Sequence, residues 1–268
     1  MIKNNYLDNY KNVKVLVTGS TGFKGSWLCY WLNSISAKVY GIGLKPERDF
    51  ILFDKLRMKE KIKQYYCDIA NFNKLDSLVK KVKPDIVFHC AALSRPMKIH
   101  EQDINKSIDL NIIGTANVTK ICKINNVKLI YFSTGYVYEG TKGNYKESDP
   151  IKPFNNYGLS KLGGECSVAM YKNSLILRIT MTEKPFIHKK AFYNLKSNFM
   201  FHDEIIEILP KIINQKGILN IGGKSQSIYS FAKISNKKVK KIKALKKNNL
   251  PLNQTMNLKK LNKLLKKN

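Results

Sequence analysis

A tyrosine and a lysine four residues apart form the clearest candidate for chemistry in this sequence. Tyr157 and Lys161 are separated by Gly-Leu-Ser, and this spacing puts both side chains on one face of a helix. Reduction of a ketone requires a hydride on carbon and a proton on oxygen, and a phenol with a pKa of about 10 is a poor proton relay near neutral pH. A neighbouring ammonium favours the phenolate and lowers that pKa. The pair is therefore a candidate proton donor, although the same spacing also occurs by chance on solvated helix faces.

A segment with two hydroxyl groups precedes this pair in the chain. Ser133 and Thr134 follow the apolar run 127–132, which we interpret as a strand that ends at the ligand-binding edge of a sheet. The hydroxyl of Thr134 can hydrogen-bond the same substrate oxygen as Tyr157. Residues 139–156, rich in Gly, Lys, Asn and Pro, then form a loop long enough to indicate a functional role.

A glycine-rich turn near the start of the chain offers a site for an anion. The apolar run 13–17 precedes Gly19-x-x-Gly22-x-x-Gly25, and apolar residues at helical spacing follow, so the segment predicts strand, turn and helix. Glycines without Cβ let a diphosphate approach the N–H groups of the helix start, where the dipole contributes about half a positive charge. The spacing differs from the standard Gly-x-Gly-x-x-Gly pattern. We nevertheless interpret the turn as a nucleotide-binding site rather than a purely structural one.

Strand and helix patterns alternate along most of the chain. After the first unit, strands are expected at residues 38–44, 64–69, 84–92, 127–132 and 174–179, with amphipathic helices between them. This rhythm predicts an α/β fold with a doubly wound, mainly parallel sheet. We expect a dinucleotide-binding domain over residues 1–179 and a small C-terminal substrate-binding lobe over residues 180–268, partly interleaved with the first. In the second part we expect a helix at 205–212, a strand at 217–222 and a C-terminal amphipathic helix that packs on this lobe.

The residues after the second strand bear on the choice of cofactor. An acid at this position prefers NAD, whereas a base accommodates the additional phosphate of NADP. Lys45 and Arg48 follow the strand, so we favour NADP, with NAD as the alternative because Glu47 and Asp49 lie beside them.

Composition narrows the class of protein. The formal net charge of +29 comes almost entirely from lysine. Proteins that read bases favour arginine, and the chain has few arginines. We therefore interpret the charge as a solvated surface that steers anionic substrates, not as a nucleic-acid interface. Five separated cysteines without a C-x-x-C pair favour reduced core residues over disulfides or a metal site. No apolar run has the length of a membrane span and no signal peptide is evident, so the expected location is the cytoplasm.

In combination, these motifs resemble the extended short-chain dehydrogenase/reductase family, also known as the NAD-dependent epimerase/dehydratase family. The resemblance covers nearly the whole chain, and its motifs are the glycine turn, Asp68-Ile69, His89-x-Ala91-Ala92, Asn111-x-x-Gly114-Thr115, Ser133-Thr134 and Tyr157-x-x-x-Lys161. It implies a Rossmann fold, and dimers are common among such relatives. It also implies a cofactor site in which three groups of residues bind the diphosphate, the adenine and the inner part of the dinucleotide: Gly19, Thr21, Gly22, Phe23 and Gly25; Asp68 and Ile69; and Ala91, Ala92 and Leu93.

The resemblance also assigns roles to the candidate catalytic residues. Tyr157 would be the general acid and base, Lys161 would bind the nicotinamide ribose and tune Tyr157, and Thr134 would position the substrate oxygen. Asn111 would be a packing residue that holds water. His89, inside an apolar run, is expected to be packed rather than catalytic.

Within that family, residues 132–147 are similar to dTDP-4-dehydrorhamnose reductases, whereas the first turn is more similar to CDP-glucose 4,6-dehydratases. The resemblance implies NAD(P)H-dependent reduction of the 4-keto group of a nucleotide-activated 6-deoxy sugar, in surface polysaccharide biosynthesis. The alternatives are an epimerase, a 4,6-dehydratase and a non-catalytic dinucleotide-binding regulatory protein. Typical dehydratases carry Asp-Glu after the threonine, where this chain has Gly135 and Tyr136.

The irregular residues 180–200 are expected to line the sugar pocket. One or more of Arg178, Lys184, Lys189 and Lys190 would lie near the diphosphate of the substrate, and the alternative is that the lysines are simply solvated.

Overall fold

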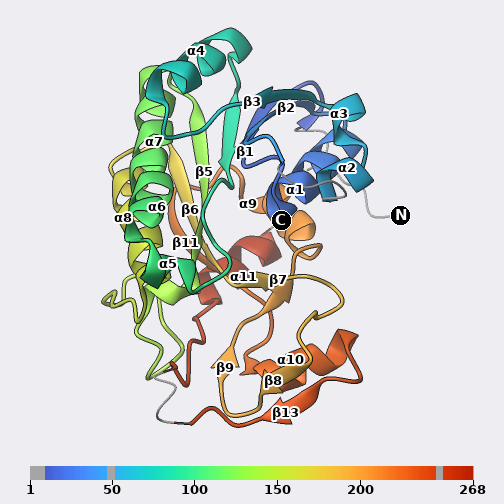
Figure 1. Cartoon of the computed structure of the whole chain (residues 1–268), viewed down its shortest axis with the longest axis vertical. Coiled ribbons are helices and arrows are strands. Elements are labelled where there is room, and N and C mark those ends of the chain that lie inside the picture. Colours follow the sequence, from blue (N-terminus) through green and yellow to red (C-terminus); the bar gives the residue numbers. More distant parts are fainter. Residues whose placement is uncertain (1–9, 47–51, 246–249, 268) are drawn as a thin grey trace.

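The apolar runs of the sequence form the strands of one parallel sheet. The computed structural model describes residues 10–46, 52–245 and 250–267, and in this part of the chain the sheet has the order β11-β6-β5-β4-β1-β2-β3 (Figure 1). The strands are β1 (Lys14–Thr18), β2 (Lys38–Gly43), β3 (Lys63–Tyr66), β4 (Ile86–His89), β5 (Lys128–Thr134), β6 (Ser174–Ile179) and β11 (Gly217–Ile221). Every neighbouring pair is parallel, as expected for apolar strands that are covered on both faces. The predicted α/β fold with a doubly wound sheet is confirmed.

Helices cover both faces of this sheet (Figure 1). Successive residues of a strand point to opposite faces of the sheet. Val15 and Val17 of β1 therefore pack on one face, in the same core as Trp31 and Leu32 of α1. Leu16 belongs to the core on the other face. The first layer contains α1 (Phe23–Ser34) and α9 (Ile205–Ile212), with the short helices α2 (Leu52–Lys55) and α3 (Met58–Lys61) against α1. The second contains α4 (Phe72–Val82), α7 (Gly114–Ile124) and α8 (Asn156–Ala169).

The helical region between β4 and β5 is interrupted in the structure. It consists of α5 (Ile99–Gln102), α6 (Ile104–Ser107), a π-helical segment (Ile108–Ile113) and α7. π-Helical turns are rare and are found frequently at functional sites. This one carries Asn111, which is fully buried.

Short strands and one helix after β6 form a smaller lobe, seen at the bottom of Figure 1. Its pairs are β7 (Met181–Thr182) with β10 (Met200–Phe201), β8 (Lys190–Phe192) with β13 (Lys240–Ile242), and β9 (Lys196–Ser197) with β12 (Gln226–Ser227). Helix α10 (Ile228–Ser235) adds Phe231 to an apolar cluster with Phe186 and Phe201. Between these elements the chain returns to the large sheet through α9 and β11.

The expected C-terminal amphipathic helix is α11 (Lys259–Lys267). It packs against α9 and β11, and Leu261, only 2% exposed, joins the core on the α1 side of the large sheet. α9 and β11 both belong to residues 180–268, so the helix packs on elements of the second part of the chain, as expected, and through them on the core of the large sheet. An amphipathic pattern predicts that one face of a helix is buried, but it does not identify the surface that covers that face.

Candidate functional site

The glycine turn brings three backbone segments into direct contact. Gly19 has a φ of +71°, which favours glycine, and a Cβ there would lie 2.6 Å from the backbone nitrogen of Ala91 at the end of β4. A Cβ on Gly25 would lie 2.0 Å from the carbonyl oxygen of Gly19. Gly22 is the N-cap of α1, and no side chain caps this end of the helix. The missing Cβ atoms let these backbone segments pack closely, and the uncapped N-terminus of α1 fits the diphosphate of a dinucleotide.

The residues expected around the adenosine lie at the ends of β2 and β3. Lys45 is exposed just beyond β2, and Asp68 is exposed beyond β3. Ile69 is buried, and its carbonyl accepts a hydrogen bond from the side-chain amide of Asn117. The structure thus brings Lys45, Asp68 and Ile69 to one edge of the sheet, while Glu47, Arg48 and Asp49 lie outside the described residues.

The segment after β4 is held by Asn111. The backbone N–H of Leu93 donates to Asn111 Oδ1 at 2.8 Å, and Asn111 Nδ2 donates to the carbonyl of Leu93 and to Ser160 Oγ. Because Ser160 lies between Tyr157 and Lys161 on α8, Asn111 fixes α8 relative to the loop that starts with Ala91 and Ala92. This is a packing role, as predicted.

His89 is buried between two hydroxyl groups, as expected for a packed residue. Its Nδ1 lies 2.6 Å from Thr18 Oγ1, and its Nε2 lies 3.0 Å from Thr115 Oγ1. Burial, reinforced by the charge of Lys161, lowers the pKa of His89 to about 3, so its imidazole is neutral at physiological pH.

Thr134 and Tyr157 meet where β5 ends and α8 begins. Asn155 caps α8 by accepting the N–H of Gly158 at 2.8 Å, which places Tyr157 in the first turn of the helix. A Cβ on Gly158 would lie 2.5 Å from the carbonyl oxygen of Tyr136, so glycine permits this close approach of α8 to the segment after Thr134. The ring of Tyr157 is held edge-on against Tyr136, with 6.0 Å between the ring centroids.

Burial dominates the ionisation of the Tyr157 and Lys161 pair. It raises the pKa of Tyr157 to about 12, although the Thr134 hydroxyl and the Arg95 charge oppose the rise. Burial, together with repulsion from Lys24, lowers the pKa of Lys161 to about 7. Lys161 Nζ lies over the ring of Tyr131, 4.2 Å from its centroid. The pKa of Tyr157 is therefore shifted in the direction opposite to the expected lowering by Lys161.

Arg178 does not lie in a substrate pocket, contrary to the expectation. It is fully buried, and it donates hydrogen bonds to the carboxylate of Glu165 and, at 2.8 Å, to the hydroxyl of Tyr138. Ser133 Oγ donates to the same carboxylate at 2.7 Å, so the network fixes the end of β5 against α8. A charged residue inside an apolar strand requires a buried partner of opposite charge. This rule could have predicted from the sequence that Arg178 forms a buried ion pair. Lys184, Lys189 and Lys190 are exposed.

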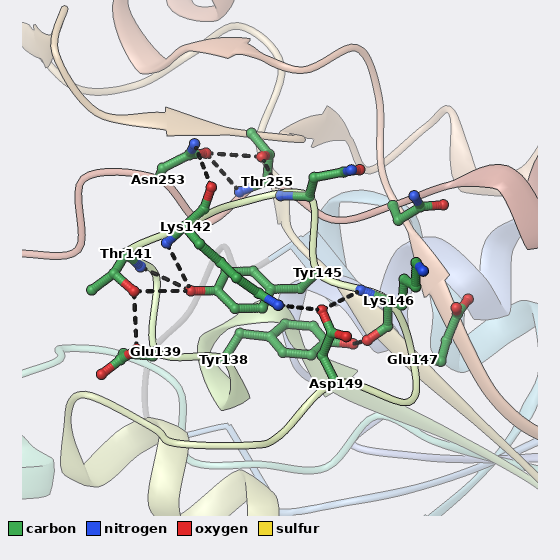
Figure 2. A network of polar contacts seen from close by, with 12 residues as sticks. Tyr138, Glu139, Thr141, Lys142, Tyr145, Lys146, Glu147, Asp149, Asn253 and Thr255 are labelled. Atoms are coloured by element: carbon green, nitrogen blue, oxygen red, sulfur yellow. Dashed lines mark hydrogen bonds and ion pairs between the residues drawn. The ribbon is translucent and has the colours of Figure 1, made fainter.

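The loop between β5 and α8 is anchored to the C-terminal segment (Figure 2). The hydroxyl of Tyr145 accepts hydrogen bonds from the backbone N–H groups of Thr141 and Lys142, and the N–H of Asn144 donates to Thr255 Oγ1 at 2.8 Å. Tyr145 also stacks on Tyr138, with 4.8 Å between the ring centroids. The loop thus holds the ends of the two elements that carry Thr134 and Tyr157.

Lys24 is a site residue that the motif analysis did not single out. It stands inside the glycine motif, in the first turn of α1, and lines a small hollow with Cys90, Phe132 and His202. Burial lowers its pKa, and repulsion from Arg95 adds to this effect. The sequence feature that could have identified Lys24 is its position: it is a cation in the first turn of a helix whose N-terminus is expected to bind an anion.

Other expectations concern metals, cysteines and membranes. In the described ranges, no group of three His, Cys, Asp or Glu residues is placed to hold a metal ion. All five cysteines are free thiols, with Cys166 exposed on α8. No helix among the described residues is long and apolar enough to cross a membrane.

The fold and the motifs together define the class of this protein. Residues 13–185 match the family model described as the RmlD substrate binding domain, and this match covers more than half of the chain. The chain therefore belongs to this family, which confirms the resemblance to nucleotide-sugar short-chain dehydrogenases/reductases.

Particular relatives extend this result. The chain is 32% identical over 178 residues to CDP-glucose 4,6-dehydratase of Salmonella typhimurium, with 65% of this chain and 48% of that protein covered. It is 30% identical over 174 residues to methionine adenosyltransferase 2 subunit beta of Pongo abelii, with 64% of this chain and 47% of that protein covered. The chain thus spans about half the length of the curated relatives it matches. The structure of dTDP-4-dehydrorhamnose reductase from Bacillus anthracis in complex with NADP shares the fold, with a TM-score of 0.71, 20% identity, and coverage of 94% of this chain and 91% of that chain.

Proposed function

We propose that the protein is an NAD(P)H-dependent reductase of the 4-keto group of a nucleotide-activated 6-deoxy sugar, a reaction that serves surface polysaccharide biosynthesis. The observation that carries the proposal is the hydrogen-bonding contact of Thr134, at the end of β5, with Tyr157 in the first turn of α8, which also carries Lys161. The uncapped N-terminus of α1 fits a diphosphate. Membership in the RmlD substrate binding domain family supports it.

In this mechanism each residue has a separate task. Thr134 donates a hydrogen bond to the keto oxygen and orients it. Tyr157 donates its phenolic proton to that oxygen, and the cofactor supplies the hydride to the carbon. Lys161 would bind the ribose of the nicotinamide half. An anionic ligand beside Lys161 would raise its pKa, which burial lowers to about 7, and the ammonium would then lower the pKa of Tyr157.

The cofactor would lie along the edge formed by β1, β2 and β4. Gly19, Thr21, Gly22, Phe23 and Gly25 would hold the diphosphate, Asp68 and Ile69 the adenine, and Ala91, Ala92 and Leu93 the inner part. The exposed Lys45 favours NADP over NAD, because a base beyond β2 can pair with the 2′-phosphate.

The residues after Thr134 favour a reductase over a dehydratase. Elimination of water requires an additional acid and base, but Gly135 and Tyr136 follow the threonine, and the nearby carboxylates of Glu165 and Glu183 are paired with arginines. An epimerase would use the same three side chains as the reductase, and net consumption of cofactor separates these two activities.

A regulatory dinucleotide-binding protein is the second candidate. The similarity to methionine adenosyltransferase 2 subunit beta, which is named as a subunit of another enzyme, favours it. The presence of all three candidate catalytic side chains argues for an enzyme.

Oxidation of NADPH and NADH in the presence of dTDP-, CDP-, UDP- and GDP-linked 4-keto-6-deoxy sugars tests the proposal. We expect substrate-dependent loss of the nicotinamide absorbance with one of these nucleotides. Tyr157→Phe should reduce turnover by about 100-fold or more, since it removes the proton donor, while the Kd for the dinucleotide stays the same. Dinucleotide binding without turnover on any sugar would favour the regulatory protein, and a fully active Tyr157→Phe variant would refute the mechanism.

A further inference from the structure

An ion pair joins the two parts of the molecule beside Tyr157. Arg95 lies in the loop after β4, and Glu183 directly follows β7 in the smaller lobe. Arg95 Nη1 donates to Glu183 Oε1 at 2.6 Å. The pair therefore connects the sheet edge to the segment that was expected to line the sugar pocket.

The two partners are held to different degrees. Glu183 is the more fixed, since its side chain is 21% exposed and its second oxygen accepts a hydrogen bond from Thr182 Oγ1 at 3.0 Å. The side chain of Arg95 is 51% exposed, and among the described residues its guanidinium donates only this one hydrogen bond. A guanidinium has five N–H donors, so Arg95 can accept a further anion.

The charge of Arg95 reaches the reacting centre. It acts to lower the pKa values of Tyr157 and Tyr136, and it also acts to lower the pKa of Lys24. Burial acts to raise the pKa of Glu183, but hydrogen bonds from its own backbone and from Arg95 hold it below the usual value, so Glu183 stays ionised. Arg95 is thus a cation near Tyr157 whose partner in the folded chain is a carboxylate.

We propose that Arg95 binds the diphosphate of the nucleotide-sugar substrate, and that Glu183 is a competing anion which that diphosphate displaces. The inference rests on the proposed function, because it requires a nucleotide-linked substrate. Planar guanidinium groups bind two phosphate oxygens at once, and they bind the two oxygens of a carboxylate in the same way. A carboxylate can therefore occupy the place of a phosphate beside an arginine. The diphosphate of the cofactor has its own site at the glycine turn of α1, whereas Arg95 faces the lobe.

Two substitutions with opposite expected effects test this assignment. We would titrate the full chain, saturated with NADP, with CDP, UDP, dTDP and GDP and with UDP-glucose and UDP-glucuronic acid, using calorimetry. Arg95→Met should weaken binding of the preferred nucleoside diphosphate by roughly 10- to 100-fold, because it removes charged hydrogen bonds. Glu183→Gln should strengthen that binding, because it removes the competitor. The Kd for NADP should be unchanged in both variants.

The control is Arg57→Met, which removes the same charge from an exposed pair with Glu60 on α3. It should leave nucleotide binding unchanged, and thermal melting of each variant reports its folding. Weaker binding in both Arg95→Met and Glu183→Gln would show that the pair is only structural. Unchanged binding in Arg95→Met would refute the proposal, and a loss confined to UDP-glucuronic acid would assign Arg95 to a sugar carboxylate instead. A wild-type protein that binds none of these nucleotides would overturn the proposed function as well.

Discussion

Lys161 is a buried ammonium whose folded environment opposes its charge. It is 2% exposed, and burial and Lys24 lower its pKa to about 7, whereas the unfolded chain keeps the ordinary value near 10.5. Such a group holds fewer protons in the folded state than in the unfolded state between these two pH values. Its charge therefore destabilises the folded protein most below about pH 7, and the penalty decreases as the pH rises. An anionic ligand beside Lys161 would restore the charge, which links the site's electrostatics to binding.

Lys161→Met should accordingly stabilise the protein in a pH-dependent way. At pH 7, without nucleotide, we expect the variant to have the higher free energy of unfolding. Between pH 7 and pH 9 its advantage over the wild type should decrease by about 2–3 kcal/mol, at about 1.4 kcal/mol per pH unit. Urea denaturation at several pH values measures this. Lys172→Met, on an exposed side chain, is the control, and an advantage of Lys161→Met that is independent of pH would contradict the account.

At the scale of elements, the site depends on two close contacts. One is between the glycine turn and α1, and the other is between α8 and the π-helical segment. Asn111 couples α8 to the loop after β4, and the Arg178 and Glu165 pair couples α8 to β6. The glycine turn has little freedom to adjust, because backbone atoms surround Gly19 and Gly25. These contacts fix α8, which carries Tyr157 and Lys161, against the π-helical segment and β6.

Gly25→Ala tests the tightness of the turn. Alanine is the better helix former by about 1 kcal/mol, so propensity alone would stabilise α1. Its Cβ would instead lie 2.0 Å from the carbonyl of Gly19, so we expect destabilisation by about 1–3 kcal/mol and weaker dinucleotide binding. Gly163→Ala on α8 is the comparison variant: its Cβ would lie 2.8 Å from side-chain atoms of Ile112 in the π-helical segment rather than against backbone, so it should destabilise the protein less than Gly25→Ala. Normal stability and binding in Gly25→Ala would show that the turn can open without cost.

At the scale of the whole molecule, the chain after β6 contributes to both the lobe and the large sheet. β11 pairs with β6, and α11 then covers this end of the sheet (Figure 1). The C-terminal helix is therefore part of the main core, although lysines make up most of its surface.

Leu261→Ala should lower the free energy of unfolding by about 2–5 kcal/mol, because it leaves a cavity in that core. Leu252→Ala, at a side chain that is 54% exposed, should have little effect. Chemical denaturation measures both variants. A neutral Leu261→Ala would place α11 outside the cooperative core.

Sequence patterns predicted the helices and strands better than they predicted the contacts between residues that are distant in sequence. The apolar runs predicted all strands of the large sheet, and their alternation with helices predicted parallel pairing but not the strand order. Parallel pairing puts the carboxyl ends of the strands at one edge, so Thr134 and Tyr157 were expected there. The burial of Arg178 and the direction of the pKa shift of Tyr157 were not predicted. Each depends on residues that are distant in sequence, which periodicity does not detect.

Transfer of deuterium from the cofactor to the sugar tests the central claim most directly. The protein would be incubated with NADPH deuterated at C4 of the nicotinamide, on the transferred face, and with the nucleotide-linked 4-keto-6-deoxy sugar that it turns over. We expect one deuterium at C4 of the sugar for each NADPH oxidised, and a loss of this label with Tyr157→Phe. A product without deuterium, or epimerisation without net oxidation of NADPH, would contradict the account.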